Sequence, residues 1–148
     1  MCAIGTLLEL QGVARVTRVL LVDDDAALRE TLADALAIAG LDVSQADNGA
    51  TALAMIESSG FDVVVSDLYM PGVDGLELLM GLQRAAIPTP VIVMTGGFKG
   101  HFGNPDPLTE PNLKAARIFG AVRTLHKPFL PSELIREIEA IASQTRAA

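Results

Sequence analysis

Short apolar runs rich in Val, Leu and Ile recur along this chain, and segments with helical spacing of apolar residues separate them. Such an alternation predicts parallel strands joined by right-handed crossovers, with helices on both faces of the sheet. We therefore expect an α/β fold built on a doubly wound, five-stranded parallel sheet. The predicted strands are 19–22, 41–46, 61–66, 91–94 and 122–126, and the predicted helices are 26–39, 51–58, 76–85, 112–119 and a last one that opens at 131.

The composition predicts one domain with an aliphatic core. The chain has 148 residues, half of them hydrophobic, yet it contains only five Phe, one Tyr and no Trp. A domain of roughly 150 residues buries about 70% of its unfolded surface, and a core of Leu, Ile, Val and Ala suits a parallel sheet covered on both faces. We expect the domain to span 18–146, after an N-terminal extension, 1–17, that shows no clear period.

Charge and cysteine content exclude several classes of protein. The formal net charge is −7 and no Lys/Arg cluster is present, so nucleic-acid binding is not expected; a cation or a basic patch on a partner protein fits better. Cys2 is the only cysteine, which rules out a disulfide framework. No apolar run approaches the ~20 residues that span a bilayer, and no basic segment precedes an apolar stretch at the N-terminus. We expect a cytoplasmic protein without membrane contact.

Carboxylates follow two of the predicted strands directly. Asp23 and Asp24 close the first apolar run, and Asp67 closes the third. The carboxyl ends of parallel strands meet at one edge of a doubly wound sheet, where ligands bind. Since clustered carboxylates repel one another, we expect a hard divalent cation with oxygen ligands among them. Asp25 follows as well, but it is more simply explained as a helix N-cap.

Two further polar residues lie at that edge, directly after the last two predicted strands. Thr95 follows the fourth strand and Lys127 follows the fifth. Together the residues fit phosphoryl transfer: Asp67 as the nucleophile, Asp23 and Asp24 as holders of Mg²⁺, and Thr95 and Lys127 as donors to phosphoryl oxygens. Each residue alone has an ordinary structural explanation, and only the joint pattern, in the right order at one edge, indicates a site.

These residues resemble the receiver domain of bacterial two-component response regulators. The resemblance covers about 18–142 and implies a flavodoxin-like sheet with strand order 2-1-3-4-5. It would make Asp67 the acceptor of a phosphoryl group from a sensor histidine kinase or a histidine phosphotransfer protein. The matching stretches are VLLVDDD at 19–25, SDLYMPGVDG at 66–75, VIVMTG at 91–96 and HKPF at 126–129.

The resemblance also implies individual roles at the site. Asp24 and Asp67 would ligate Mg²⁺ directly, together with the backbone carbonyl of Tyr69, whereas Asp23 would act through a water molecule. Thr95 would bind the phosphoryl group and swing toward it.

Lys127 would pair with the phosphoryl group, and the peptide bond from Lys127 to Pro128 would be cis. These assignments come from the resemblance and not from the spacing of the residues.

Three features near the end of the chain bear on how such a switch would report its state. The family usually has an aromatic residue three positions before the lysine, and this chain has Thr124 there. The interval between Thr95 and Lys127 is longer than receiver domains usually have. We expect the loop at 96–108 within it to become ordered, or to change the affinity for a partner, when Asp67 is phosphorylated. His126 neighbours the lysine along a strand, so we expect it to face the other way and to be structural.

The favoured function is a phospho-acceptor signalling switch and not an enzyme. Because the chain ends with the fifth predicted helix, we expect a stand-alone receiver whose output is binding to a separate effector protein. We expect a monomer or a weak homodimer.

Two alternatives share the α/β fold. A phosphatase of the haloacid-dehalogenase type would use Asp23 as nucleophile, with Asp25, Thr95 and Lys127 in support. This chain lacks the later pair of acids that such a phosphatase has at a strand end. The phosphatase hypothesis also leaves Asp67 and the motif that follows it unexplained. A flavin-binding domain is disfavoured, because no phosphate-cradling loop follows the first strand and the acids there would repel a phosphate.

Overall fold

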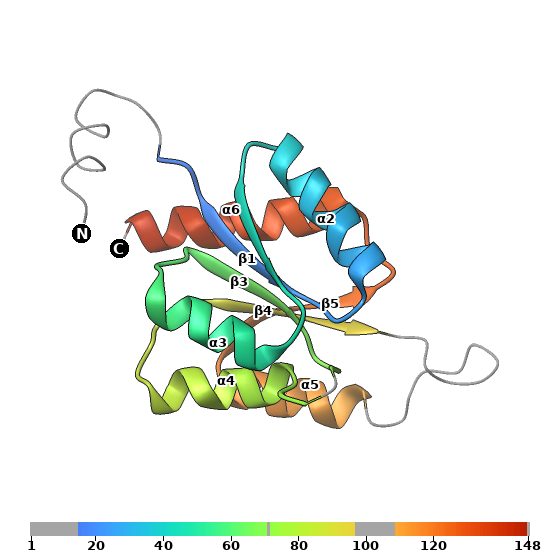
Figure 1. Ribbon diagram of the computed structural model, residues 1–148, viewed down its shortest axis with the longest axis vertical. Coiled ribbons are helices and arrows are strands. Elements are labelled where there is room, and N and C mark those ends of the chain that lie inside the picture. Colours follow the sequence, from blue (N-terminus) through green and yellow to red (C-terminus); the bar gives the residue numbers. More distant parts are fainter. Residues whose placement is uncertain (1–14, 71, 97–108, 148) are drawn as a thin grey trace.

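Five parallel strands form one sheet at the centre of the molecule (Figure 1). The computed structural model describes residues 15–70, 72–96 and 109–147. The strand order is β2-β1-β3-β4-β5, which is the order that the resemblance implies, and this confirms the expected fold class. The strands are β1 (Arg18–Val22), β2 (Asp42–Ala46), β3 (Val63–Asp67), β4 (Val91–Gly96) and β5 (Ala121–Lys127).

Helices cover both faces of the sheet. In Figure 1, α2 and α6 lie on one face, and α3, α4 and α5 lie on the other. Each helix connects two parallel strands or follows the last one, which is the arrangement that parallel pairing requires. The helices are α2 (Ala26–Ile38), α3 (Gly49–Ser58), α4 (Gly75–Arg84), α5 (Thr109–Ile118) and α6 (Pro131–Ala147).

Three of the helices begin at an Asp or Asn side chain. Each of these side chains accepts a hydrogen bond from a backbone N–H of the first turn, where helices leave donors unpaired. The caps are Asp25 for α2, Asn48 for α3 and Asp74 for α4.

Alternate residues of the central strands pack into two separate apolar layers. In β1, Leu20 and Val22 pack against the α3, α4 and α5 side, whereas Val19 and Leu21 pack against α2 and α6. A strand buried on both faces must be apolar at every position, which explains the uninterrupted run in the sequence. The first layer also includes Ile56, Leu78, Leu79 and Val93, and the second includes Leu32, Leu36, Ile92, Leu134 and Ile138.

The element boundaries differ from the predictions by a few residues. The helix predicted at 112–119 begins at Thr109. The helix predicted at 51–58 begins at Gly49, and Asn48 is its cap. The predicted domain limits, 18–146, stay a prediction, and 1–14 and most of the 96–108 loop lie outside the described residues.

The segment between β3 and α4 folds back onto the sheet at Gly75. The Gly75 N–H donates to the carbonyl oxygen of Leu68 at 3.1 Å. A Cβ atom on Gly75 would overlap the carbonyl oxygen of Asp67 and crowd Leu68 Cα, both of them backbone atoms. Only glycine allows so close an approach of two backbones. The start of α4 is thereby fixed against the last residue of β3.

Replacing Gly75 with Ala should destabilise the protein. Because the added methyl group meets backbone and not a flexible side chain, we expect a loss of about 1–3 kcal/mol in the free energy of unfolding, measured by chemical denaturation. Gly60→Ala is the matched control, since a Cβ there meets nothing within 4 Å. That variant should stay within about 0.5 kcal/mol of the wild type. Equal stability of the two variants would contradict the packing argument.

Candidate functional site

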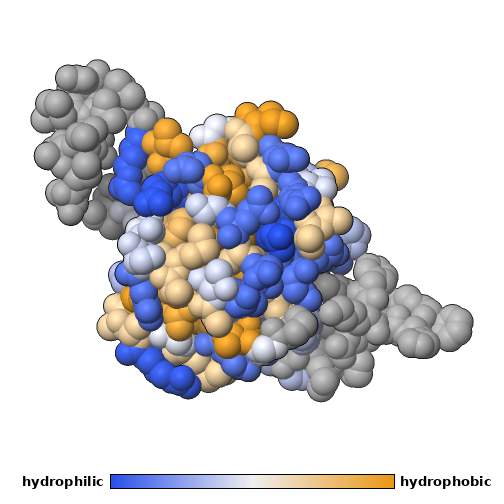
Figure 2. All heavy atoms as spheres, viewed as in Figure 1, coloured by the Kyte–Doolittle hydropathy of each residue, from blue (hydrophilic) through white to orange (hydrophobic). Residues whose placement is uncertain are grey.

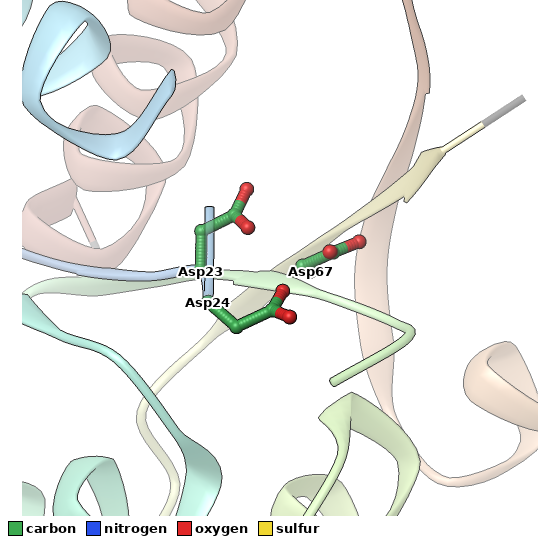
Figure 3. Close-up of side chains that lie close together, drawn as sticks. All are labelled: Asp23, Asp24 and Asp67. Carbon is green, nitrogen blue, oxygen red and sulfur yellow. The ribbon is translucent and has the colours of Figure 1, made fainter. Parts of the chain in front are cut away.

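Three aspartates meet at the carboxyl edge of the sheet (Figure 3). Asp23 and Asp24 follow β1, and Asp67 is the last residue of β3. The register pairs the residues that precede them, Val22 with Ser66, so Asp23 and Asp67 end adjacent strands at the same level. One oxygen from each carboxylate lies within 4.8 Å of the others. The structure therefore brings together the acids that the sequence indicated.

Lys127 reaches this cluster from β5, the strand at the edge of the sheet. Its Nζ atom lies 3.0 Å from Asp23 Oδ2 and 3.6 Å from Asp67 Oδ2. β4 and β3 separate β5 from β1, so the length of the lysine side chain is needed to span them. The side chain of Asp23 is completely buried, and a buried carboxylate is tolerated only when it is paired. The peptide bond from Lys127 to Pro128 is cis, as the resemblance implied.

Asp67 is held in an unfavourable electrostatic environment. Burial raises the pKa of Asp67 from 3.8 to about 6; the ammonium of Lys127 opposes this rise, and the carboxylates of Asp23 and Asp24 add to it. The backbone N–H of Tyr69 also acts to lower the pKa. Asp67 Oδ1 is buried without a hydrogen-bond partner among the described residues. A buried oxygen with no donor indicates a place for a positively charged or donating ligand.

Backbone and side-chain donors fix Asp23 in place. The Asp25 N–H donates to Asp23 Oδ1 at 3.0 Å. Arg29, on α2, donates to the Asp23 carbonyl oxygen at 2.7 Å and to the side-chain oxygen of Gln45, on β2, at 3.0 Å. In Figure 2, hydrophilic residues gather over this region, where β1 and β2 end. Asp25 itself caps α2 by accepting from the Leu28 N–H, as expected, and does not belong to the cluster.

Thr95 lies on β4 beside the cluster, but its hydroxyl is directed toward β5. Thr95 Oγ1 lies 3.4 Å from the carbonyl oxygen of Leu125 and 3.2 Å from His126 Nδ1. The sequence did not predict the contact between Thr95 and His126, because side chains alternate along a strand and His126 was expected only to face away from Lys127. The strand register reveals the contact, since it pairs Thr95 with His126. Thr124, on the same strand, accepts a hydrogen bond from Arg117 of α5 at 3.3 Å.

The donor set fits a hard divalent cation. Three carboxylates meet at this edge, and among the described residues Lys127 is the cation that forms ion pairs with them, so the carboxylates keep an excess of negative charge. Mg²⁺ prefers oxygen ligands. One oxygen from each of the three carboxylates lies within 4.8 Å of the other two, so the acids are grouped closely enough to face one ion. Asp24 is exposed, so an ion can approach from solvent.

The family of the chain follows from comparison with known proteins. The family model described as the response regulator receiver domain matches residues 19–139. The chain belongs to this family. Two solved structures illustrate the likeness: FixJ-N, with a TM-score of 0.75 and 31% identity over 88% of this chain and 96% of that one, and the Francisella response regulator 1452 receiver domain, with a TM-score of 0.74 and 30% identity over 87% and 98%.

Curated relatives are longer than this receiver chain. The transcriptional regulatory protein FixJ of Bradyrhizobium diazoefficiens is 36% identical over 127 residues, which are 86% of this chain and 57% of FixJ. The response regulator MprA of Mycobacterium tuberculosis is 36% identical over 129 residues, 87% of this chain and 52% of MprA. The chain thus spans little more than half the length of these relatives.

The family match supports a phospho-acceptor signalling domain and gives no support to the haloacid-dehalogenase alternative. Within the described part of the chain, none of the helices combines the length and the apolar character that crossing a membrane requires.

Replacing Asp67 with Asn should stabilise the metal-free protein at neutral pH. Because folding raises the pKa of Asp67 from 3.8 to about 6, the folded state disfavours the carboxylate. The wild type therefore loses stability as the pH rises from about 4 through 6, whereas Asn stays neutral. We expect the variant to gain up to about 3 kcal/mol in the free energy of unfolding near pH 7.5, and little near pH 4.

Chemical denaturation in the presence of a chelator measures this difference. Asp34→Asn removes an exposed acid of α2 and is the control, which should leave the free energy of unfolding within about 0.5 kcal/mol of the wild type. An equal gain for Asp67→Asn at both pH values would show that the burial of the charge is not the cause.

Proposed function

We propose that Asp67 accepts a phosphoryl group and that the chain signals through the resulting change. The observation that carries this proposal is the buried, unpartnered Asp67 Oδ1 beside Lys127 and two further acids. A carboxylate nucleophile needs a lone pair that no hydrogen-bond donor occupies and a nearby positive charge that offsets the charge of the incoming phosphoryl group. Both are supported by the geometry at the end of β3.

The acids would hold Mg²⁺. Asp24 and Asp67 would ligate the ion, together with the backbone carbonyl of Tyr69, and Asp23 would act through water. When bound, the ion supplies positive charge that offsets the repulsion between the carboxylate and the phosphoryl oxygens. The uncompensated charge of the cluster and its oxygen-only donors support this assignment.

Lys127 and Thr95 would bind the phosphoryl oxygens. The Lys127 ammonium already lies between Asp23 and Asp67, so a small movement of its flexible side chain would place it on a new anionic group at Asp67. The Thr95 hydroxyl is a donor on the neighbouring strand, and it would have to turn away from β5 to take part.

The donor of the phosphoryl group would be a phosphohistidine on a sensor histidine kinase or a histidine phosphotransfer protein. Membership of the receiver family supports this class of partner. The output would be altered binding to an effector protein, without nucleic-acid contact by this domain. The stand-alone arrangement, the cytoplasmic location and the monomeric or weakly dimeric state stay predictions.

A small-molecule phosphodonor such as acetyl phosphate, with Mg²⁺, should add one phosphoryl group to the protein. Intact mass spectrometry detects the adduct, and reduction with borohydride followed by peptide mapping assigns it to an aspartate. We expect the adduct to disappear in Asp67→Asn and to persist in the control Asp34→Asn. An adduct that survives in Asp67→Asn, or turnover of phosphate monoesters that requires Asp23, would contradict the proposal.

Removal of one acid from the cluster should weaken Mg²⁺ binding. For Asp24→Asn we expect an affinity loss on the order of tenfold or more, because a charged ligand is replaced by a neutral one. Isothermal titration calorimetry measures it. Asp25→Asn is a stringent control: it removes the neighbouring charge, yet Asn preserves the cap of α2. Equal weakening in both variants would indicate general electrostatics and not ligation.

A further inference from the structure

The hydroxyl of Thr95 is held by β5. Thr95 Oγ1 lies 3.2 Å from His126 Nδ1 and 3.4 Å from the carbonyl oxygen of Leu125. The Thr95 side chain is completely buried, and the register places it directly beside His126. Side chains of paired residues project from the same face of a sheet. The contact therefore follows from the pairing of β4 with β5.

The chemistry of the two groups makes the imidazole the specific partner. A hydroxyl donates one proton and accepts through its lone pairs. If Thr95 donates to the Leu125 carbonyl, His126 Nδ1–H can donate to Thr95 Oγ1; if Thr95 donates to His126 Nδ1, the imidazole accepts. Either arrangement restrains the rotation of the Thr95 side chain.

Thr124, two residues before His126 on β5, does not compete for this role. Thr124 has its Oγ1 atom 3.3 Å from a guanidinium nitrogen of Arg117, and the register places it beside Val93. Among the described residues, His126 is the one whose side chain lies within hydrogen-bond distance of the Thr95 hydroxyl.

We propose that His126 is a positioning residue that restrains the Thr95 hydroxyl while Asp67 is unphosphorylated and is released when the hydroxyl turns to the phosphoryl group. This inference rests on the proposed roles of Asp67 and Thr95. The contact between Thr95 and His126 must break when the hydroxyl turns, so its free energy opposes phosphoryl binding. A ligand shifts the equilibrium between two states only by the difference in its interactions with them. His126 is exposed on an edge strand, so its release carries a change at a buried site to the surface.

Nuclear magnetic resonance of the free protein tests the contact without any phosphoryl group. Thr95→Val removes the hydroxyl and keeps the shape of the side chain. We expect the imidazole nitrogen resonances of His126 to shift in this variant. Unchanged resonances would show that the hydrogen bond is absent in solution and would overturn the inference.

Affinity for beryllofluoride, a phosphoryl mimic, tests the consequence. In the presence of Mg²⁺, His126→Ala should bind the mimic about two- to tenfold more tightly than the wild type, because one hydrogen bond no longer restrains Thr95. His126→Asn keeps a polar atom at the position of Nδ1 and should restore wild-type affinity. His126→Gln places its polar group farther out and should behave like His126→Ala.

A double-mutant cycle separates restraint from a general structural effect. In the Thr95→Val background, His126→Ala should no longer change the affinity. An unaltered affinity in His126→Ala, or an effect that persists without the Thr95 hydroxyl, would overturn the inference alone. Failure of the wild type to bind the mimic would instead overturn the proposed function. The proposed release of His126 would fall with it, even if the imidazole resonances of His126 shift in Thr95→Val.

Discussion

The site depends on the burial of two carboxylates side by side. β1 and β3 pair in parallel and end at the same level, so Asp23 and Asp67 are forced together at the edge of the sheet. Burial and mutual repulsion both disfavour the charged state, and the raised pKa of Asp67 records this. Lys127 compensates only in part, since one ammonium faces three carboxylates. The remaining charge is what makes the edge suited to a cation and a phosphoryl group.

The same edge is held rigid by backbone contacts that leave little freedom. Gly75 lies against the backbone of Asp67 and Leu68, and Arg29 and the Asp25 N–H fix Asp23 from the other side. A preorganised set of charges loses little free energy to rearrangement when a ligand arrives. Movement is therefore expected at the side chains whose contacts are weakest, and the hydroxyl of Thr95 is the clearest example.

Much of this could be predicted from the sequence, for physical reasons that can be named. Strands such as β1 and β3 are buried on both faces, and they appear as uninterrupted apolar runs. Because parallel strands present their carboxyl ends at one edge, the residues that follow those runs could be grouped from the order of the elements alone. The helix boundaries were less accurate. α3 begins at Gly49 and not at Thr51, and α5 begins at Thr109 and not at Asn112, because local signals for turns and caps overlap.

The sequence by itself determined the fold class, the strand ends and the identity of the clustered acids, since these follow from periodicity and from the polarity of parallel strands. Only the tertiary structure decided how the polar groups are partnered. The reach of Lys127 across two strands, the unpartnered oxygen of Asp67 and the contact between Thr95 and His126 depend on strand register and on side-chain direction. Neither quantity is encoded locally, because each arises from the pairing of segments that are distant in the chain.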